Sequence, residues 1–317
     1  MNQILNEIQY VVHNSKNIKI NFDTIKKIAE KFEPKSKVKW TDAIPFKIPN
    51  LTKEQQISFY FVLNSINFSY WGEPKWTIKY QDMEVDGCVA MIACLYRAIE
   101  EGYDILNSEY LKDITQEDLK YILRGNIEIP LFNQRLKILK EIGQVVYDDF
   151  DSNFENILEE SDYDVIKLLK IITTKFSTYN DCSTYNDKAI QFHKRAQLLI
   201  SDIFELLKDT DKTITNINIL TAFADYKIPQ LLRKINILTY SQELSNITDN
   251  KQEIPLNDPK EIEIRANMVW AIELLRKEIN KRYPDINTIE VNNYIWLLSQ
   301  EKSKGDKPYH LTRTIAY

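Results

Sequence analysis

Glycine is scarce in this chain, and its distribution limits the folds that the chain can adopt. Only 6 of the 317 residues are glycine, and none lies within ten residues of another. The phosphate-binding loops of dinucleotide-binding and P-loop proteins need clustered glycines, as does the nucleophile elbow of α/β-hydrolases, because the backbone turns tightly there against a ligand or a helix. The sequence therefore excludes all three classes.

Charge and composition indicate a globular protein. The 41 basic and 46 acidic side chains leave a net charge of −5, and 44% of the residues are hydrophobic. A negative net charge counts against a protein that grips long nucleic acids through their phosphates, although it permits a local basic pocket. The length permits one domain over residues 1–317, either undivided or built as two helical lobes with a cleft between them.

Cysteine and histidine are too few and too scattered to indicate a metal site or a disulfide framework. The chain has three of each, with no C-x-x-C or H-E-x-x-H pattern, which favours a reducing, cytoplasmic location and predicts no metal or other cofactor. The longest apolar run, Cys88–Tyr96, is too short to cross a bilayer and is typical of a buried helix. The first residues have neither a basic nor a continuous apolar segment, so we expect no signal peptide.

Helical periodicity dominates the pattern of apolar residues. Two capping motifs, at residues 52–55 and 258–261, each precede an apolar stripe with the period of a helix. Strand-like alternation is confined to short pieces, the best being Asn17–Phe22 and Trp76–Tyr80. We therefore predict an all-α fold with at most a small β element. Further helices are expected at about 2–13, 23–33, 88–101, 116–124, 131–146, 163–176, 188–207, 226–236 and 287–299.

Two unusual segments have structural interpretations. Ser177–Asp181 is repeated as Ser183–Asp187, which we interpret as a tolerated insertion in a surface loop. Residues 148–164 hold eight acidic and no basic side chains, and part of this segment is similar to a calcium-binding loop. The sixth position of that loop is Phe154, where the sharp turn needs glycine, so a solvated acidic face is the better interpretation.

Two further segments combine aromatic or cationic side chains in a way that suits ligand binding. Residues 67–76 place four aromatic side chains after a helix, either as a cap on the core or as a wall on which a flat heterocycle could stack. In residues 192–197 the adjacent cations Lys194 and Arg195 border an apolar stripe. They form either a solvated pair or a positive pocket that anchors a phosphorylated small molecule.

The stretch from Leu220 to Leu232 carries a single carboxylate in largely apolar surroundings. Asp225 lies four residues before Pro229, which we place in the first turn of a helix. The carboxylate either caps that helix or presents a preorganised charge to a site. The last ten residues mix histidine, arginine and tyrosine, which predicts a docked tail.

Taken in order, these segments resemble the queuosine salvage protein family. The most specific matching blocks are Phe192-x-Lys194-Arg195-Ala196-Gln197 and Thr221-x-Phe223-Ala224-Asp225-Tyr226-x-x-Pro229-Gln230. The resemblance covers nearly the whole chain from about residue 50. The other matching blocks are Asn67–Trp71, Cys88–Gly102, Tyr240-Ser241, Glu263-x-Arg265, Ile286-Asn287 and His310-x-x-Arg313-x-x-x-Tyr317.

By this resemblance, the fold is all-helical and related to the helix-hairpin-helix DNA glycosylases, and the protein is a hydrolase. Members of the family release queuine by hydrolysing the N-glycosidic bond of queuosine 5′-phosphate or of the nucleoside. The catalytic aspartate of the family maps onto Asp225, its phosphate-binding lysine onto Lys194 and a base-contacting phenylalanine onto Phe223. The implied partner is a small nucleotide or nucleoside, and no cofactor is needed.

The chain departs from the family pattern at three positions. Members carry a histidine near the position of Ile44, and an Asp-x-x-Leu-Trp-Asp pattern where this chain has residues 292–297. The resemblance implies that Asn292 and Asn293 contact the substrate, and that Asn292 and Leu297 replace two carboxylates that hold the polar substituents of queuine. The resemblance therefore implies the type of reaction more firmly than the identity of the base that is released.

Two alternatives stay open at this point. The first is a related glycosylase that acts on another nucleotide or on a nucleobase in DNA, although the acidic composition counts against DNA. The second is a non-catalytic nucleobase-binding protein, against which the presence of Asp225 and Lys194 weighs. The oligomeric state is left open.

Overall fold

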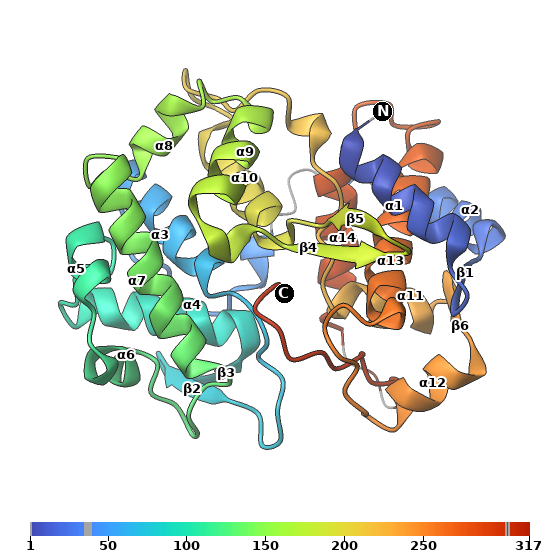
Figure 1. Ribbon diagram of the computed structural model, residues 1–317, viewed down its shortest axis with the longest axis horizontal. Helices are drawn as coiled ribbons and strands as arrows, with labels where there is room; N and C mark the ends of the chain where they lie inside the picture. Colours follow the sequence, from blue (N-terminus) through green and yellow to red (C-terminus); the bar gives the residue numbers. More distant parts are fainter. Residues whose placement is uncertain (1, 35–39, 302, 304) are drawn as a thin grey trace. The chain divides into compact units, whose positions relative to one another are not determined.

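The computed structural model describes residues 2–34, 40–301, 303 and 305–317, and it is mostly helical (Figure 1). These residues contain fourteen α-helices and three two-stranded antiparallel sheets. The predicted all-helical fold is therefore confirmed, and both predicted strands are present as β1 (Ile18–Ile20) and β2 (Thr77–Tyr80). The relation to the helix-hairpin-helix DNA glycosylases stays a prediction. None of the helices in the described residues has the length and apolar character that crossing a bilayer requires.

The chain divides into two compact units, each assembled from several stretches of sequence. The chain passes from unit 2 into unit 1 at Asp181, the last residue of the first duplicated copy. It passes back into unit 2 after Lys194, the first residue of α10 (Lys194–Leu207). Unit 1 comprises Met1–Ala43, Asp181–Lys194 and Asn218–Arg313, and unit 2 comprises Ile44–Asn180, Arg195–Ile217 and Thr314–Tyr317.

Helix α13 (Pro259–Ile279) forms the core of unit 1. It packs against α1 (Gln3–Asn14), α2 (Phe22–Lys31) and α14 (Thr288–Leu298), which lie around it in Figure 1. Fifteen of its 21 residues are buried, so the helix is enclosed on nearly every side. The other elements of unit 1 are η1 (Trp40–Ala43), β1 paired with β6 (Leu238–Tyr240), the hairpin of β4 (Cys182–Tyr185) and β5 (Lys188–Gln191), α11 (Lys227–Lys234) and α12 (Gln242–Asp249).

Close packing of two helices organises much of unit 2. Helix α5 (Ser108–Asp113) lies against α7 (Phe132–Asp149) at Gly143, where an added Cβ would overlap the backbone of Leu111 and Lys112. Glycine at this position therefore sets the distance between the two helices. The other elements of unit 2 are α3 (Lys53–Ser65), β2 paired with β3 (Met83–Asp86), α4 (Gly87–Glu100), α6 (Gln116–Ile122), α8 (Glu155–Glu160), α9 (Val165–Lys175), η2 (Ser177–Tyr179) and most of α10.

Both predicted helix starts are capped, but the reciprocal capping box predicted at both is present only at residues 52–55. Thr52 and Gln55 exchange side-chain and backbone hydrogen bonds at the start of α3, which is the reciprocal pattern of a capping box. At the start of α13, Asp258 accepts a hydrogen bond from Lys260 N at 2.8 Å, and Pro259 is the first helical residue.

The interpretation of the duplicated segment as a surface insertion is wrong, and so is the single helix predicted over 188–207. The chain forms the β4–β5 hairpin before α10 begins at Lys194. The hairpin turn places Asn186 and Asp187 at φ of 47° and 61°, a left-handed conformation that these residue types tolerate. Tyr179 and Tyr185, one from each copy, are 1% and 4% exposed. The duplication therefore contributes to the core.

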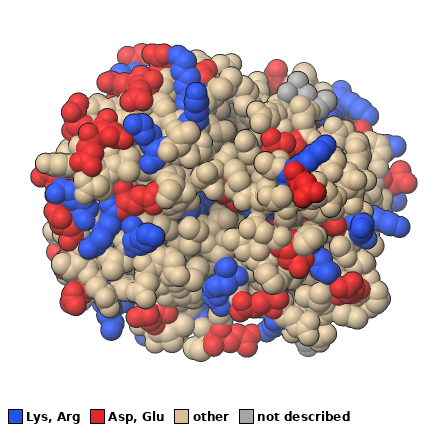
Figure 2. Space-filling view, in the orientation of Figure 1, with Lys and Arg blue, Asp and Glu red and all other residues tan. Residues whose placement is uncertain are grey.

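The acidic segment 148–164 forms ion pairs with lysines of unit 2. Lys175 Nζ lies 2.9 Å from an Asp149 carboxylate oxygen. Lys212 Nζ lies 3.0 Å from Glu155 and 3.2 Å from Glu159. Acidic side chains with basic ones among them gather over the region of α8 in Figure 2. Because these pairs are largely exposed, each contributes on the order of 0–1 kcal/mol to stability.

Candidate active site

The loop between η3 (Ile217–Ile219) and α11 is buried although it forms neither helix nor strand. Five consecutive side chains, from Thr221 to Asp225, are each at most 9% exposed. A buried loop holds backbone polar groups away from water, and these groups need partners. Oδ1 of Asn292 on α14 accepts a hydrogen bond from Phe223 N at 3.1 Å. Helix α14 therefore holds this loop two residues before Asp225.

The Asp225 carboxylate bonds to the first turn of α11, one residue before the N-cap residue Tyr226. Its Oδ1 accepts a hydrogen bond from Ile228 N at 2.9 Å, and Pro229 lies in the first turn of the helix, as predicted. Asp225 thus satisfies an amide of the first turn, as the capping alternative requires, although it precedes the N-cap by one residue. The other alternative, a preorganised charge, depends on the electrostatic surroundings of the carboxylate.

Those surroundings distinguish Asp225 from an ordinary capping aspartate. Asp164, which caps α9, is partly exposed, and hydrogen bonds from Asn216 and from backbone amides hold its pKa below the usual range. Burial instead raises the pKa of Asp225, against the opposing effects of Lys194, the Ile228 amide and Lys227. Capping alone does not require such burial, so Asp225 is a candidate for chemistry.

Lys194 supplies positive charge to Asp225 within unit 1. It is the first residue of α10 and is 8% exposed. Its ammonium group is the largest of the influences that lower the pKa of Asp225 against burial. The fold therefore brings Lys194 and Asp225 within electrostatic range, although about thirty residues separate them in the sequence.

Helix α14 presents the predicted substrate contacts on different faces. Asn293 and Leu297 lie four residues apart and share one face, whereas Asn292 and Leu297 are separated by about 140° around the helix axis. Asn292 faces the loop, where it bonds to Phe223. The Asn293 amide makes no hydrogen bond to another side chain or backbone group in the described part of the chain, so it is available to a ligand.

A buried ion pair in unit 1 was not singled out from the sequence. Arg265 on α13 donates to both carboxylate oxygens of Asp181, at 3.0 and 2.5 Å. Oδ2 of Asp181 also accepts a hydrogen bond from Lys194 N at 3.1 Å. Arg265 lies within a family-like block, but the duplicated segment hid the role of Asp181 in the sequence.

The aromatic loop after α3 is anchored by two buried arginines of unit 2. The guanidinium carbons of Arg135 and Arg195 lie 4.2 and 5.2 Å from the centre of the Phe68 ring. Arg135 also donates to the backbone oxygens of Ile66 and Phe68. Trp71 is 6% exposed. The ring of Phe68 thus packs with protein cations, which supports the interpretation of this segment as a cap on the core.

The predicted docked tail is confirmed. In unit 1, Ile254 N donates to Leu311 O at 2.7 Å, and Thr312 Oγ1 donates to Ile254 O at 2.9 Å. His310 is 2% exposed, and burial together with the charge of Arg265 lowers its pKa to about 3. The imidazole is therefore neutral at physiological pH, and it is not poised to donate a proton as a cation.

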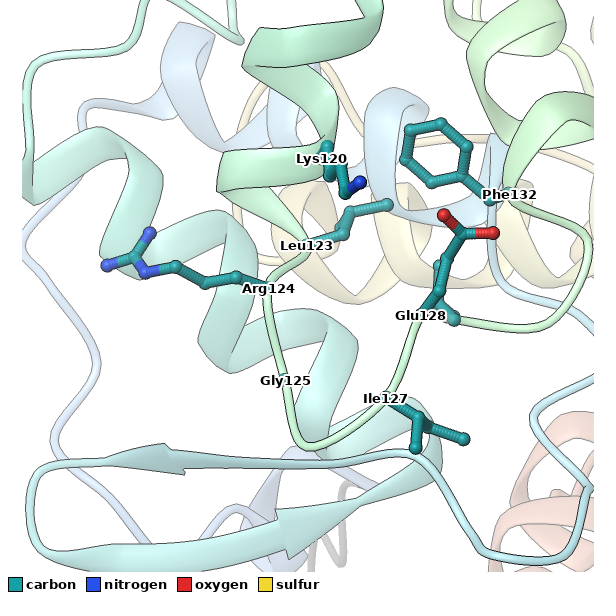
Figure 3. A pocket seen from close by; sticks show the side chains of 8 residues that line it. Lys120, Leu123, Arg124, Gly125, Ile127, Glu128 and Phe132 are labelled. Carbon is teal, nitrogen blue, oxygen red and sulfur yellow. The ribbon is translucent and has the colours of Figure 1, made fainter.

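A cavity of about 170 Å³ lies in unit 2 between the end of α6 and the start of α7. Figure 3 shows Lys120 and Glu128 extending toward the space beside Phe132, whereas Arg124 points away from it. Arg124 pairs instead with Glu101. None of the predicted site residues lines this cavity, and we assign it no part in the chemistry.

Comparison with known proteins identifies the family to which this chain and its candidate site belong. A model of the family described as "Queuosine salvage protein" matches residues 48–317, which is most of the chain. The chain belongs to the queuosine salvage protein family. The resemblance seen in the sequence is therefore confirmed.

Relatives from this family are similar over almost their whole length. A protein of Sphaerobacter thermophilus named "Queuosine 5′-phosphate N-glycosylase/hydrolase" is 33% identical, over 99% of this chain and 97% of its own. Proteins of the same name from Bos taurus and Schizosaccharomyces pombe are 29% and 24% identical, over 98% and 97% of this chain and 97% and 94% of their own.

The three family-matched residues of the most specific blocks lie in unit 1. Lys194, Phe223 and Asp225 belong to these blocks, and α14 approaches the same loop through Asn292. Of the three departures from the family pattern, Asn292 and Leu297 lie in unit 1, whereas Ile44 is the first residue of unit 2. The roles of the individual residues stay predictions.

The hydrogen bond from Phe223 to Asn292 leads to a prediction for α14. Asn292→Leu should leave Phe223 N buried without its acceptor, which costs about 1–3 kcal/mol of stability and displaces the loop that carries Asp225. We expect a lower melting temperature and a lower kcat. Asn292→Asp keeps an acceptor oxygen and is the matched control. Equal melting temperatures and rates for the leucine and aspartate variants would show that the hydrogen bond does not hold the loop.

The raised pKa of Asp225 predicts the acid limb of the pH profile. If the ionised carboxylate is required, activity is lost as pH falls through this pKa, which lies above the ordinary value of about 3.9. Lys194→Met removes a charge that opposes the shift, so the limb should move to still higher pH. The measurement is kcat/KM against pH on the nucleoside, because a substrate phosphate would titrate near pH 6. A limb that stays in place in Lys194→Met would contradict the electrostatic link.

Proposed function

We propose that this protein hydrolyses the N-glycosidic bond of queuosine 5′-phosphate and releases queuine. The observation that carries the proposal is the buried Asp225 carboxylate, whose pKa is raised and which lies within electrostatic range of Lys194. Relatives that match nearly the whole chain are named for this reaction. We further propose a small-molecule substrate in a reducing, cytoplasmic compartment, because the three cysteines are scattered along the sequence with no C-x-x-C pattern.

The bond to be broken makes a carboxylate useful. The bond between the ribose C1′ and the base nitrogen breaks with its electron pair going to the base, and positive charge develops on the ribose as an oxocarbenium ion. The queuine base has a carbon where purines have N7, so protonation at that position cannot help the base to leave. This raises the demand for stabilisation of the sugar cation.

In the proposed mechanism, Asp225 meets that demand. Its carboxylate either stabilises the oxocarbenium ion electrostatically or captures C1′ as a covalent ribosyl intermediate. A water molecule then adds its oxygen to C1′ and gives up a proton, while the departing base gains one. The products are ribose 5-phosphate and free queuine, and the hydrogen bond from Ile228 N holds the carboxylate in place throughout.

The other site residues have proposed roles in binding. Lys194 pairs with the 5′-phosphate, which is the only dianion on the substrate. Phe223 contacts the face of the base, and its backbone is held by Asn292. Asn293 offers an amide to the edge of the base.

The experiment that tests this function compares four substrates. The protein is incubated with queuosine 5′-phosphate, queuosine, GMP and dGMP, and the released base is measured by mass spectrometry. We expect queuine from queuosine 5′-phosphate and no guanine from GMP or dGMP. Release of guanine would favour a different nucleotide substrate, and absence of any released base, with binding retained, would favour a non-catalytic nucleobase-binding protein.

A further inference from the structure

The start of α10 is held by Asp181, a residue outside the helix, through both its carboxylate and its backbone oxygen. Oδ2 of Asp181 accepts a hydrogen bond from Lys194 N at 3.1 Å. The backbone oxygen of Asp181 accepts two more, from Phe192 N at 3.0 Å and from His193 N at 3.1 Å. Three consecutive residues that end at Lys194 therefore depend on the position of one aspartate.

Asp181 is itself fixed by Arg265. The guanidinium group donates to both carboxylate oxygens, at 3.0 and 2.5 Å, and Arg265 is fully buried on α13, the core helix of unit 1. The same guanidinium lies 3.9 Å from the centre of the Phe192 ring. A planar, bidentate pair of this kind sets orientation as well as distance. The core helix is thereby connected to the residue that begins α10.

The local backbone needs this support. His193 has a φ of 46°, in the left-handed region that a residue with a side chain adopts only at an energetic cost. This conformation turns the chain from β5 into α10, and it determines the direction in which Lys194 leaves the backbone. The surrounding contacts must hold the turn, and the hydrogen bonds to Asp181 converge on it.

We propose that Asp181 and Arg265 are positioning residues that orient Lys194 toward the 5′-phosphate of the substrate, an inference that rests on the proposed function of Lys194. Neither residue is required to touch the substrate. Their contribution is to place a flexible lysine at the start of a fixed helix, so that less freedom is lost when the phosphate binds. The pair would therefore determine how strongly the protein prefers a nucleotide over its nucleoside.

The test is the preference ratio, defined as kcat/KM for queuosine 5′-phosphate divided by kcat/KM for queuosine. Asp181→Asn should lower this ratio by about tenfold, and Arg265→Lys should lower it by less. In both variants kcat/KM for queuosine should change little. A general structural defect would lower kcat/KM for both substrates together and leave the ratio unchanged. Thermal unfolding of every variant identifies any that fails to fold, and Arg265→Lys decides the test if Asp181→Asn does not fold.

Glu263→Gln is the matched control. Glu263 is 1% exposed and lies on α13 two residues before Arg265. It accepts a hydrogen bond from Tyr185 Oη at 2.9 Å. Tyr185 lies next to the turn of the β4–β5 hairpin, whereas Asp181 lies next to the open end of the same hairpin. Its substitution also removes a buried charge beside the hairpin, but leaves the Asp181 contacts to residues 192–194 in place. The ratio should stay within about twofold of the unmodified protein.

The outcomes separate this inference from the proposed function. A lower ratio in the Asp181 and Arg265 variants, but not in Glu263→Gln, supports positioning. An unchanged ratio in folded Asp181→Asn and Arg265→Lys, or an equal fall in Glu263→Gln, overturns it while leaving the hydrolase function intact. If Lys194→Met itself leaves the ratio unchanged, both the phosphate role of Lys194 and the positioning inference fail. If the unmodified protein releases no queuine, the proposed function fails first.

Discussion

Replacing Asp225 with asparagine is expected to lower kcat on queuosine 5′-phosphate by about 10²–10³, because the substitution removes the charge that meets the oxocarbenium ion and keeps nearly the same shape. KM should change little. The measurement is steady-state release of queuine by the purified variant. The matched control is Asp258→Asn, which removes the charge from another capping aspartate of unit 1 and should leave kcat unchanged.

The same substitution should not destabilise the protein at neutral pH. Because burial raises the pKa of Asp225 in the folded state, ionisation of this group opposes folding at pH values above that pKa, and the opposition disappears below the unfolded-state value. Asparagine is neutral and keeps an oxygen for Ile228 N. The melting temperature of Asp225→Asn at pH 7 should equal or exceed that of the unmodified protein. Near-normal turnover by the variant would instead assign Asp225 to helix capping alone.

Replacing Lys194 with methionine is expected to lower kcat/KM for queuosine 5′-phosphate by about one to two powers of ten more than for queuosine. A charge-assisted hydrogen bond contributes about 1.5–3 kcal/mol, and each 1.4 kcal/mol is a factor of ten in affinity. Only the nucleotide has the phosphate with which the lysine would pair. The measurement is kcat/KM on both substrates at one pH and ionic strength.

The control for Lys194 is the second cation near Asp225. Lys227 also lowers the pKa of that carboxylate, but it begins α11 and has no proposed phosphate contact. Lys227→Met should therefore act through Asp225 and affect nucleotide and nucleoside alike. Equal losses on both substrates in Lys194→Met would place Lys194 in the same electrostatic role and remove it from phosphate binding.

Most helices could be predicted because their information is local. The caps of α3 and α13 and the apolar stripes behind them lie within one stretch of sequence, so propensity and period suffice to identify them. The error at 188–207 has the opposite cause. Lys188–Gln191 becomes a strand because it pairs with Cys182–Tyr185, and its own four residues carry too little pattern to predict that pairing.

The candidate site residues could be named from the sequence, but their burial and its effect on their pKa could not be predicted from it. A carboxylate alone in an apolar stretch indicated Asp225, and the capping geometry with Ile228 is a local relation over three residues. Whether that carboxylate is an ordinary cap depends on burial, and burial is what separates Asp225 from the partly exposed cap Asp164. Burial depends on how distant segments pack, which no local pattern contains.

The sequence by itself determined the helical class, the positions of the main caps and the family, because the scattering of the glycines, the apolar period and the motif blocks are all read along the chain. Only the tertiary structure decided which residues support the site. Asn292 reaches the backbone of Phe223 from 69 residues away, and Arg265 reaches Asp181 from 84 residues away. Hydrogen bonds and ion pairs of this range form only after the core helix α13 and its neighbours pack, because packing brings donors and acceptors together that sequence spacing leaves unrelated.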